Sequence, residues 1–326
     1  MGALLKIRDL TVTVRGEMGS NDVLSGVSFS IGEGETVGIV GESGCGKSIT
    51  ALSVMGLLGK NVTVREGNVW FDGKDLLSMN ERELDVVRGG SLSMIYQDAL
   101  GALSPVFTVG NQLKETMRAH LPVSRAEADA RAVALLGRMG LPDPVAMMKK
   151  YPHQLSGGQR QRVMIAMALC CSPRLLIADE PTTALDVTVQ AQIMRLLREE
   201  REASGMSLWL ISHDIGLIAQ TCDRVLVMYA GQIVEEATAR ELFARPAHPY
   251  TQMLLRCVPQ VDVAKEELGS IAGQVPAYYG EMVGCRFAPR CPYATEACRS
   301  TQPMCDVDQA HRVRCCRAGK EASCDE

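Results

Sequence analysis

The chain has 326 residues, of which 46% are hydrophobic and 22% charged, as is ordinary for a globular protein. A net charge of -4, an isoelectric point of about 5.8 and the lack of any lysine or arginine run argue against a nucleic-acid partner. No apolar stretch approaches the ~18 residues of a membrane span, and the first residues lack a signal-peptide profile. We therefore expect a cytoplasmic protein with one large or two modest domains.

Three stretches in the first quarter of the chain predict an antiparallel β layer. Residues 4–14 alternate between apolar and polar positions, and residues 23–31 alternate again. Residues 64–76 predict a hairpin in which Asp72 and Gly73 make the tight turn.

Residues 41–48 read GESGCGKS, which fits the phosphate-binding pattern G-x-x-x-x-G-K-[ST]. Residues 35–40 predict a buried strand before this phosphate loop, and residues 49–58 predict a helix after it. Loop N–H groups and the positive end of that helix would hold an anion. Lys47 would reach the β- and γ-phosphates, and the Ser48 hydroxyl would ligate Mg²⁺. The alternative is a glycine-rich turn followed by a chance Lys-Ser pair.

Two further predicted core strands end in polar side chains. Residues 92–97 end at Gln97, and residues 174–180 end in Asp179 and Glu180. A strand-end aspartate is where a P-loop enzyme holds Mg²⁺, and the adjacent glutamate can act as a general base on the attacking water. The alternative is a pair of helix-capping acids.

Helices are predicted over residues 109–120, 125–139 and 187–204, and a third core strand over residues 207–212 ends at His213. A final hairpin turns at Ala230-Gly231. Strands that alternate with helices predict a parallel sheet with its functional groups at the carboxyl ends of the strands.

A second anion site is predicted at Ser156-Gly157-Gly158-Gln159, which opens a helix over residues 160–171. A chain with one phosphate loop needs only one phosphate cradle, so the second would act on another subunit's nucleotide. This predicts a dimer. The alternative is an ordinary helix cap at Ser156.

These motifs resemble, in content and order, those of ATP-binding cassette (ABC) ATPases over roughly residues 4–255. Residues 41–48 match the Walker A loop, Gln97 matches the Q-loop, and residues 155–159 match the signature. Residues 175–180 match the Walker B strand, residues 184–186 match the D-loop, and His213 matches the switch histidine. The resemblance implies an α/β fold with a P-loop NTPase (RecA-like) core, an antiparallel β layer and a helical subdomain near residues 98–170. It also implies two ATP molecules held head to tail between two cassettes.

The same resemblance implies roles for individual residues. Catalysis would use Lys47, Gln97, Glu180 and His213, and Mg²⁺ would contact Ser48, Gln97 and Asp179. The residues that would contact nucleotide are Gly41, Glu42, Ser43, Gly44, Cys45, Gly46, Lys47, Ser48, Ile49, Asp179, Ser156, Gly157, Gly158 and Gln159.

Two features depart from the family pattern or add to it. No aromatic residue occurs in residues 12–16, where the family stacks one on adenine, so Val14 or Arg15 would cover the base and the choice between ATP and GTP stays open.

Cys45 lies inside the phosphate loop. A thiol beside a helix N-terminus predicts a lowered pKa and alkylation that bound ATP prevents. The alternative is a tolerated small residue.

The composition changes near residue 257, which predicts a cassette over residues 1–256 and a small, irregular, cysteine-rich extension over residues 257–326. The spacing C-x₅-C-x₆-C-x₁₆-C is made by Cys285, Cys291, Cys298 and Cys315, with Cys316 as an alternative fourth member. Four thiolates suit zinc or an iron–sulfur cluster. The short C-x₂₋₄-C spacing usual in zinc sites is absent, and reduced thiols without metal are the third alternative.

The extension, together with residues 102–105 and 248–251, resembles the dipeptide, oligopeptide and nickel group of importer ATPases. The resemblance implies a [4Fe–4S] cluster on Cys285, Cys291, Cys298 and Cys315. It further implies an ATPase subunit at the cytoplasmic face of the plasma membrane, energising import of dipeptides or oligopeptides. Its partners would be a second ATPase subunit, identical or different, two permease subunits and, indirectly, an extracytoplasmic substrate-binding protein. The alternatives are a nickel importer, a soluble ABC ATPase without a permease, and a metal-binding regulator with a vestigial ATPase.

Overall fold

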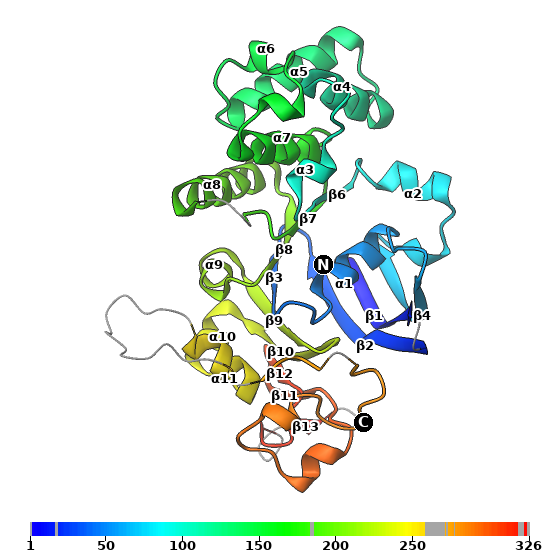
Figure 1. Ribbon diagram of the computed structural model, residues 1–326, viewed down its shortest axis with the longest axis vertical. Helices are drawn as coiled ribbons and strands as arrows, with labels where there is room; N and C mark the ends of the chain where they lie inside the picture. Colours follow the sequence, from blue (N-terminus) through cyan, green and yellow to red (C-terminus); the bar gives the residue numbers. More distant parts are fainter. Residues whose placement is uncertain are drawn as a thin grey trace. The chain divides into compact units, whose positions relative to one another are not determined.

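The computed structural model describes residues 2–16, 19–182, 186–257, 271, 273–276, 278–318 and 323–324. The chain divides into two compact units, which we describe separately (Figure 1). Unit 1 contains Gly32–Glu35 and Ser78–Trp209, and unit 2 contains Ala3–Ile31, Thr36–Leu77 and Leu210–Glu326. The units follow packing contacts rather than composition, so the boundary near residue 257 stays a prediction.

Unit 2 contains the predicted antiparallel layer. Its strands, in spatial order, are β2 (Gly19–Gly32), β1 (Ala3–Gly16), β4 (Val62–Phe71) and β5 (Lys74–Asp75). Leu5 and Ile7 are buried, and so are Leu10 and Val12, although the two pairs occupy opposite phases of a strict alternation. Register irregularities between Arg8 and Thr11 and between Thr11 and Val12 interrupt the pairing of β1 with β4, and the alternation changes phase across them.

A second sheet of unit 2 begins with β3 (Thr36–Val40), in which every residue is buried. β3 pairs in parallel with β9 (Arg224–Tyr229), and β9 forms the predicted hairpin with β10 (Gln232–Thr238). The extension is less irregular than predicted, because β12 (His311–Val313) pairs with β10 and β11 (Cys305–Asp308) pairs with β12. The remaining elements of this unit are α1 (Lys47–Met55), α9 (Ile215–Thr221), α10 (Ala239–Ala244), α11 (Pro249–Arg256), β13 (Ser323–Cys324) and the 3₁₀ turns η1 (Leu76–Ser78, whose last residue belongs to unit 1), η3 (Ala288–Arg290) and η4 (Glu296–Arg299).

Unit 1 carries two parallel core strands and the predicted helices. β6 (Leu92–Ile95) pairs in register with β7 (Leu175–Asp179). The helices are α2 (Glu81–Val87), α3 (Ala99–Ala102), α4 (Val109–His120), α5 (Arg125–Arg138), α6 (Pro144–Met147), α7 (Gly157–Leu169) and α8 (Val187–Ser204), with the 3₁₀ turn η2 at Pro152–Gln154. β8 (Ser207–Ser212) then leads the chain into unit 2.

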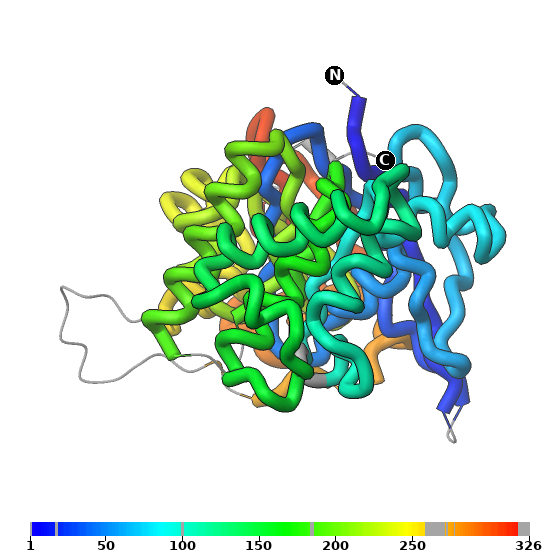
Figure 2. The backbone as a smooth tube through the Cα atoms, turned by 90° about the horizontal axis from the view of Figure 1, so that it is seen from above, coloured from blue at the N-terminus to red at the C-terminus, as the bar shows by residue number. Residues whose placement is uncertain are grey.

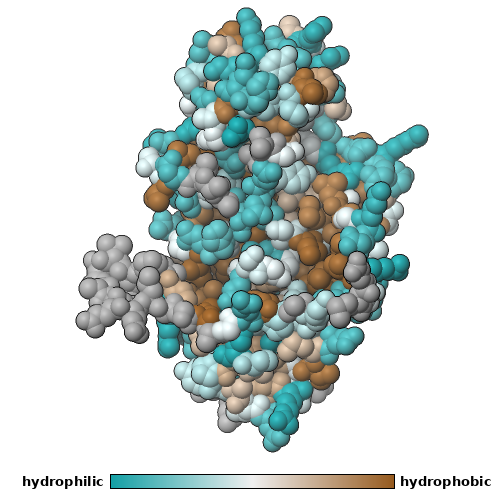
Figure 3. All heavy atoms as spheres, viewed as in Figure 1, coloured by the Kyte–Doolittle hydropathy of each residue, from teal (hydrophilic) through white to brown (hydrophobic). Residues whose placement is uncertain are grey.

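Helices α4 to α7 pack against one another in both views of the backbone (Figures 1 and 2). Apolar residues such as Leu113 on α4 and Leu136 on α5 are fully buried in this group, whereas its visible outer surface is mostly hydrophilic (Figure 3). The predicted capping box starts α5, because Ser124 and Glu127 each accept the other's backbone N–H.

Among the described residues, every helix is too short or too polar to serve as a membrane span.

Candidate functional site

The phosphate loop, residues 41–48, connects β3 to α1 in unit 2. A Cβ atom at Gly41 would lie 2.2 Å from the carbonyl oxygen of Met228, so only glycine allows the loop to approach β9 this closely. Gly46 caps α1 with φ +110°, a backbone conformation that side-chain-bearing residues rarely adopt. The sequence pattern is therefore matched by the backbone geometry that it requires.

Lys47 begins α1 and is buried against the loop. Its ammonium donates hydrogen bonds to the carbonyl oxygens of Gly41, at 2.7 Å, and of Glu42, at 3.0 Å. Among the described residues of the first turn of α1 none is acidic, so the positive end of the helix dipole is not neutralised there. Such a terminus favours an anionic ligand.

The pKa of the Cys45 thiol differs from the one that the sequence predicted. Its side chain is fully buried, and this burial raises the pKa of the thiol above the ordinary value, although the ammonium of Lys47, 3.8 Å from the sulfur, lowers it. The expected lowered pKa is therefore wrong, because the desolvation of a thiolate outweighs the nearby positive charge.

Three side chains that the sequence did not single out hold the phosphate loop from the side of the extension and α11. The N–H of Glu42 donates to the hydroxyl of Tyr250 at 2.9 Å, and the carboxylate of Glu42 accepts two hydrogen bonds from Arg290. The hydroxyl of Tyr279 lies 3.3 Å from the carbonyl oxygen of Gly44. The available signal was indirect: Tyr250 lies in the matched residues 248–251, and Arg290 precedes one of the predicted cysteines.

The predicted carboxylates follow β7 in unit 1. Asp179 is the last residue of the strand and is buried, and Glu180 follows with a positive φ of 47°. Gln97, just beyond β6, donates a hydrogen bond from Nε2 to the Glu180 carboxylate at 2.9 Å. The two side chains meet because β6 and β7 are parallel neighbours that end at the same sheet edge. A positive φ outside glycine costs about 1–3 kcal/mol and is concentrated at functional sites.

The predicted second anion site lies at the N-terminus of α7. The helix starts at Gly157, three residues earlier than predicted, because Ser156 and Gln159 form a capping box. The Ser156 hydroxyl accepts the N–H of Gln159 at 3.3 Å, and the Gln159 side chain accepts the N–H of Ser156 at 3.1 Å. The N–H groups of Gly157 and Gly158 lie in the first turn, where a helix supplies no acceptor of its own.

His213 belongs to unit 2, where it is exposed and follows β8 directly. The next residue, Asp214, caps α9 by accepting the N–H of Leu217 at 3.1 Å. Of the predicted D-loop, Ala184 and Leu185 lie outside the described residues, and Asp186 caps α8. The structure thus holds the phosphate loop and His213 in unit 2, and Gln97, the two carboxylates and the α7 terminus in unit 1.

The predicted cysteines meet in the extension. One small cavity is lined by the five thiols of Cys285, Cys291, Cys298, Cys315 and Cys316. The sulfurs of Cys298 and Cys316 are 3.7 Å apart. Burial raises the pKa of Cys285 to about 11, whereas the N–H of Thr295 lowers the pKa of Cys298. Cys305, which is not one of the predicted ligands, is disulfide-bonded.

The spacing of these sulfurs bears on which group they would fit. A tetrahedral zinc ion with Zn–S bonds of about 2.3 Å requires all four sulfurs to lie within roughly 3.8 Å of each other. Within the described part of the chain, no three of these thiols come within 4.8 Å of one another. A four-iron cluster bonds each thiolate to a different iron and so separates the sulfurs more widely. Five soft donors line one cavity, and their chemistry suits either zinc or an iron–sulfur cluster.

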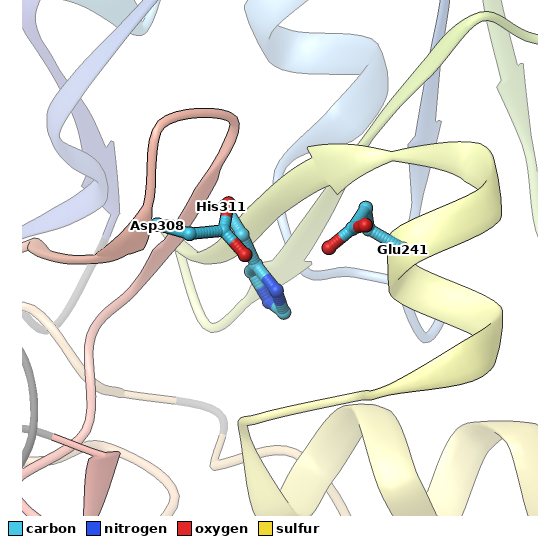
Figure 4. Close-up of side chains that lie close together, drawn as sticks. All are labelled: Glu241, Asp308 and His311. Atoms are coloured by element: carbon cyan, nitrogen blue, oxygen red, sulfur yellow. The ribbon is translucent and has the colours of Figure 1, made fainter.

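Glu241, Asp308 and His311 form the one group of possible metal ligands that lies within 4.8 Å among the described residues (Figure 4). Arg245 donates to both carboxylates, at 2.7 Å to Glu241 and 3.3 Å to Asp308. The His311 ring pairs with Glu235 at 2.7 Å. Ion pairs and this hydrogen bond account for the group, and we assign it no ion.

Comparison with known proteins gives two family matches. Residues 24–183 match the ABC transporter family, and residues 234–298 match the C-terminal region of oligopeptide/dipeptide transporters. A probable peptide ABC transporter ATP-binding protein of Sinorhizobium fredii is 48% identical over 97% of this chain and 96% of its own length. The chain belongs to the ABC transporter ATP-binding family. A dipeptide transport ATP-binding protein of Escherichia coli is 46% identical over 94% of this chain and 93% of its own.

Solved ABC structures agree with this membership. The dimeric post-hydrolysis structure of an ATP-binding cassette with ADP and phosphate has a TM-score of 0.66 and 29% identity, covering 72% of this chain and 99% of that one. The predicted P-loop fold class and the resemblance to the peptide-importer subgroup are thereby confirmed, and the family supports ATP hydrolysis. The match to the C-terminal region ends at residue 298, so it includes three of the predicted cysteines and not Cys315.

Proposed function

We propose that this ABC protein hydrolyses ATP to drive the import of dipeptides or oligopeptides. One observation supports the catalytic part of this proposal: Gln97 donates a hydrogen bond to the carboxylate of Glu180, which follows the buried Asp179 at a strand end and has a positive backbone φ. The cargo class rests on relatives named for peptide transport that are 45–48% identical over nearly the whole chain.

The residue roles follow from chemistry at each position. The phosphate loop would cradle the nucleotide phosphates, with Lys47 on the β- and γ-phosphates and Ser48 on Mg²⁺. Asp179 would hold Mg²⁺ through water, Glu180 would act as the general base, and His213 would stabilise charge on the γ-phosphate side.

The Ser156–Gln159 cap would serve a nucleotide held by a second ATPase subunit, either identical or different. The free N–H groups at the start of a 13-residue helix support this use, because they suit a γ-phosphate. The solved dimeric cassette with ADP and phosphate supports a dimeric arrangement.

The permease pair would contact the segment that follows Gln97. Val106 and Phe107 in this segment are 71% and 49% exposed, which suits contact with a partner better than contact with water. The ATPase would therefore act at the cytoplasmic face of the membrane, and a substrate-binding protein would deliver the peptide to the permeases from the other side.

We further propose a [4Fe–4S] cluster in the thiol-lined cavity of the extension. Cys285, Cys291 and Cys298 would be ligands, with Cys315 or Cys316 as the fourth. Such a cluster, when bound, would cross-link segments of the extension between residues 285 and 316.

Anaerobic purification tests this part of the proposal. Visible absorbance near 400 nm, with about four iron and four sulfide per chain, is expected, and the Cys291→Ser variant should lose both. Stoichiometric zinc without iron, or a metal-free protein purified anaerobically, would overturn it.

The catalytic proposal is tested with Glu180→Gln and the exposed control Glu296→Gln. Loss of the general base should lower ATP turnover by about 10²–10⁴-fold, while Mg-ATP binding and an ATP-dependent dimer persist. The control should match the wild type, since Glu296 lies on the extension surface. Equal steady-state hydrolysis in Glu180→Gln would refute the role of this residue.

A further inference from the structure

Two side chains of the extension reach the phosphate loop, Tyr279 and Arg290, and Arg290 makes the charged contact. This residue ends the short turn η3 and immediately precedes Cys291. Its two terminal nitrogens donate to the two carboxylate oxygens of Glu42, at 2.6 Å and 2.9 Å. The arginine side chain is only 6% exposed, so this is a largely buried, bidentate ion pair rather than a surface contact.

Other groups fix the orientation of the guanidinium. It lies over the ring of Tyr229 at 5.7 Å and also donates to the Tyr229 hydroxyl at 3.3 Å. A further hydrogen bond reaches the carbonyl oxygen of Gly273 at 3.2 Å. The planar guanidinium places two nitrogens at fixed positions opposite the two carboxylate oxygens of Glu42, and the single ammonium of a lysine could not reproduce these contacts.

Glu42 needs such a partner because of where it lies. It is the second residue of the phosphate loop, its N–H bonds to Tyr250, and its carbonyl oxygen bonds to Lys47. Its carboxylate adds a negative charge to a loop that has to accept an anion. Without Arg290 this charge would repel the phosphates and would be free to turn toward them.

We propose that Arg290 is a positioning residue of the nucleotide site, which neutralises and orients Glu42 and so makes nucleotide affinity depend on the cysteine-rich extension. This inference rests on the proposed ATP binding. It identifies the extension as a working part of the phosphate site, because the side chain that compensates the loop comes from the residue next to Cys291.

Equilibrium binding of a fluorescent ATP analogue with Mg²⁺ tests the inference in four full-length variants. Arg290→Gln should weaken binding by roughly 5- to 100-fold, the range of coupling seen within one polar network. Arg290→Lys should weaken binding less than Arg290→Gln, since the positive charge is kept. It should still weaken binding, since the bidentate contact of the guanidinium with Glu42 is lost. The matched control is Arg299→Gln, because Arg299 is an exposed arginine of the same extension that pairs with Glu296.

The double variant Glu42→Gln with Arg290→Gln decides between positioning and simple structural damage. If Arg290 acts through Glu42, removing the carboxylate should restore most of the affinity that Arg290→Gln loses. Equal weakening in the single and double variants, or unchanged binding in Arg290→Gln, would overturn the inference. If Arg290→Gln does not fold, the same comparison is made with Arg290→Lys in both backgrounds. Failure of the wild type to bind nucleotide would refute the proposed function instead.

Discussion

The pairing of His311 with Glu235 gives the sharpest stability prediction. Glu235 lies on β10 with no solvent exposure, and its carboxylate accepts the N–H groups of Ala247 and His248 at 2.7 Å and 2.9 Å. The third partner is His311 on β12, whose Nε2 lies 2.7 Å away. Because β12 pairs with β10, this contact fastens the extension to the sheet. We consider the substitution His311→Leu, which keeps an apolar side chain of similar size.

The expected cost follows from what remains buried. The carboxylate keeps its two backbone donors and loses its only side-chain partner among the described residues, worth about 1.5–3 kcal/mol for a hydrogen bond to a charged group. Leaving a buried charged acceptor short of a partner costs more than the about 1–3 kcal/mol of a neutral group. A range of roughly 2–5 kcal/mol corresponds to an increase of about 30- to several-thousand-fold in local opening, at 1.36 kcal/mol per factor of ten.

Hydrogen exchange measured by mass spectrometry is the assay, because it reports opening of individual segments. Faster exchange is expected in peptides covering β10, β11 and β12, with α4 and α5 of unit 1 as the internal reference. The double variant Glu235→Leu with His311→Leu should be less destabilised than the sum of its two single variants, since no unpaired carboxylate is left. Unchanged protection of β12 in His311→Leu would refute the reasoning.

Two further predictions concern buried titratable groups in unit 2. Burial lowers the pKa of His248 from 6.5 to about 4, so its contribution to stability is complete above pH 6.5 and is lost as the pH falls toward 4. The melting temperature should fall as the pH is lowered from 6.5 toward 4, and it should fall less steeply in His248→Asn than in the wild type. Equal dependence of the melting temperature on pH in the two proteins would contradict this prediction. Cys45 has a raised pKa and is fully buried, so it should react with iodoacetamide more slowly than Cys291 in metal-free protein at pH 7.5. Mass spectrometry of labelled peptides measures the two rates, and the reverse order would contradict this prediction.

The elements that the sequence predicted well are those with a complete local signal. α5 carries both its apolar face and its Ser124–Glu127 box, and β3 is a continuous apolar run. α2 was missed although Asn80 and Glu83 form a capping box of the same kind, because only one residue in its seven is buried and no apolar stripe marks it. The strands β11 and β12 have three or four residues each and exist through pairing with β10, which no local pattern encodes.

The candidate site shows the same division. The meeting of Gln97 with Glu180 could be predicted, because polar residues at the ends of adjacent parallel strands share one sheet edge. The raised pKa of Cys45 could not, since it depends on how fully the loop is covered. Arg290 could not be linked to Glu42 either, as 248 residues separate them and neither belongs to a regular pattern.

The extension differs in composition from the residues before it, but its contacts make it part of the same packed unit. β12 adds to the sheet beside β10, His311 completes the partners of a buried carboxylate, and Tyr279 and Arg290 reach Gly44 and Glu42 in the phosphate loop. All of these contacts lie within unit 2. Removing the extension would leave the edge of β10 unpaired, Glu235 short of a partner and the Glu42 charge uncompensated. Folding of the sheet and the electrostatics of the phosphate loop therefore both depend on residues after 257.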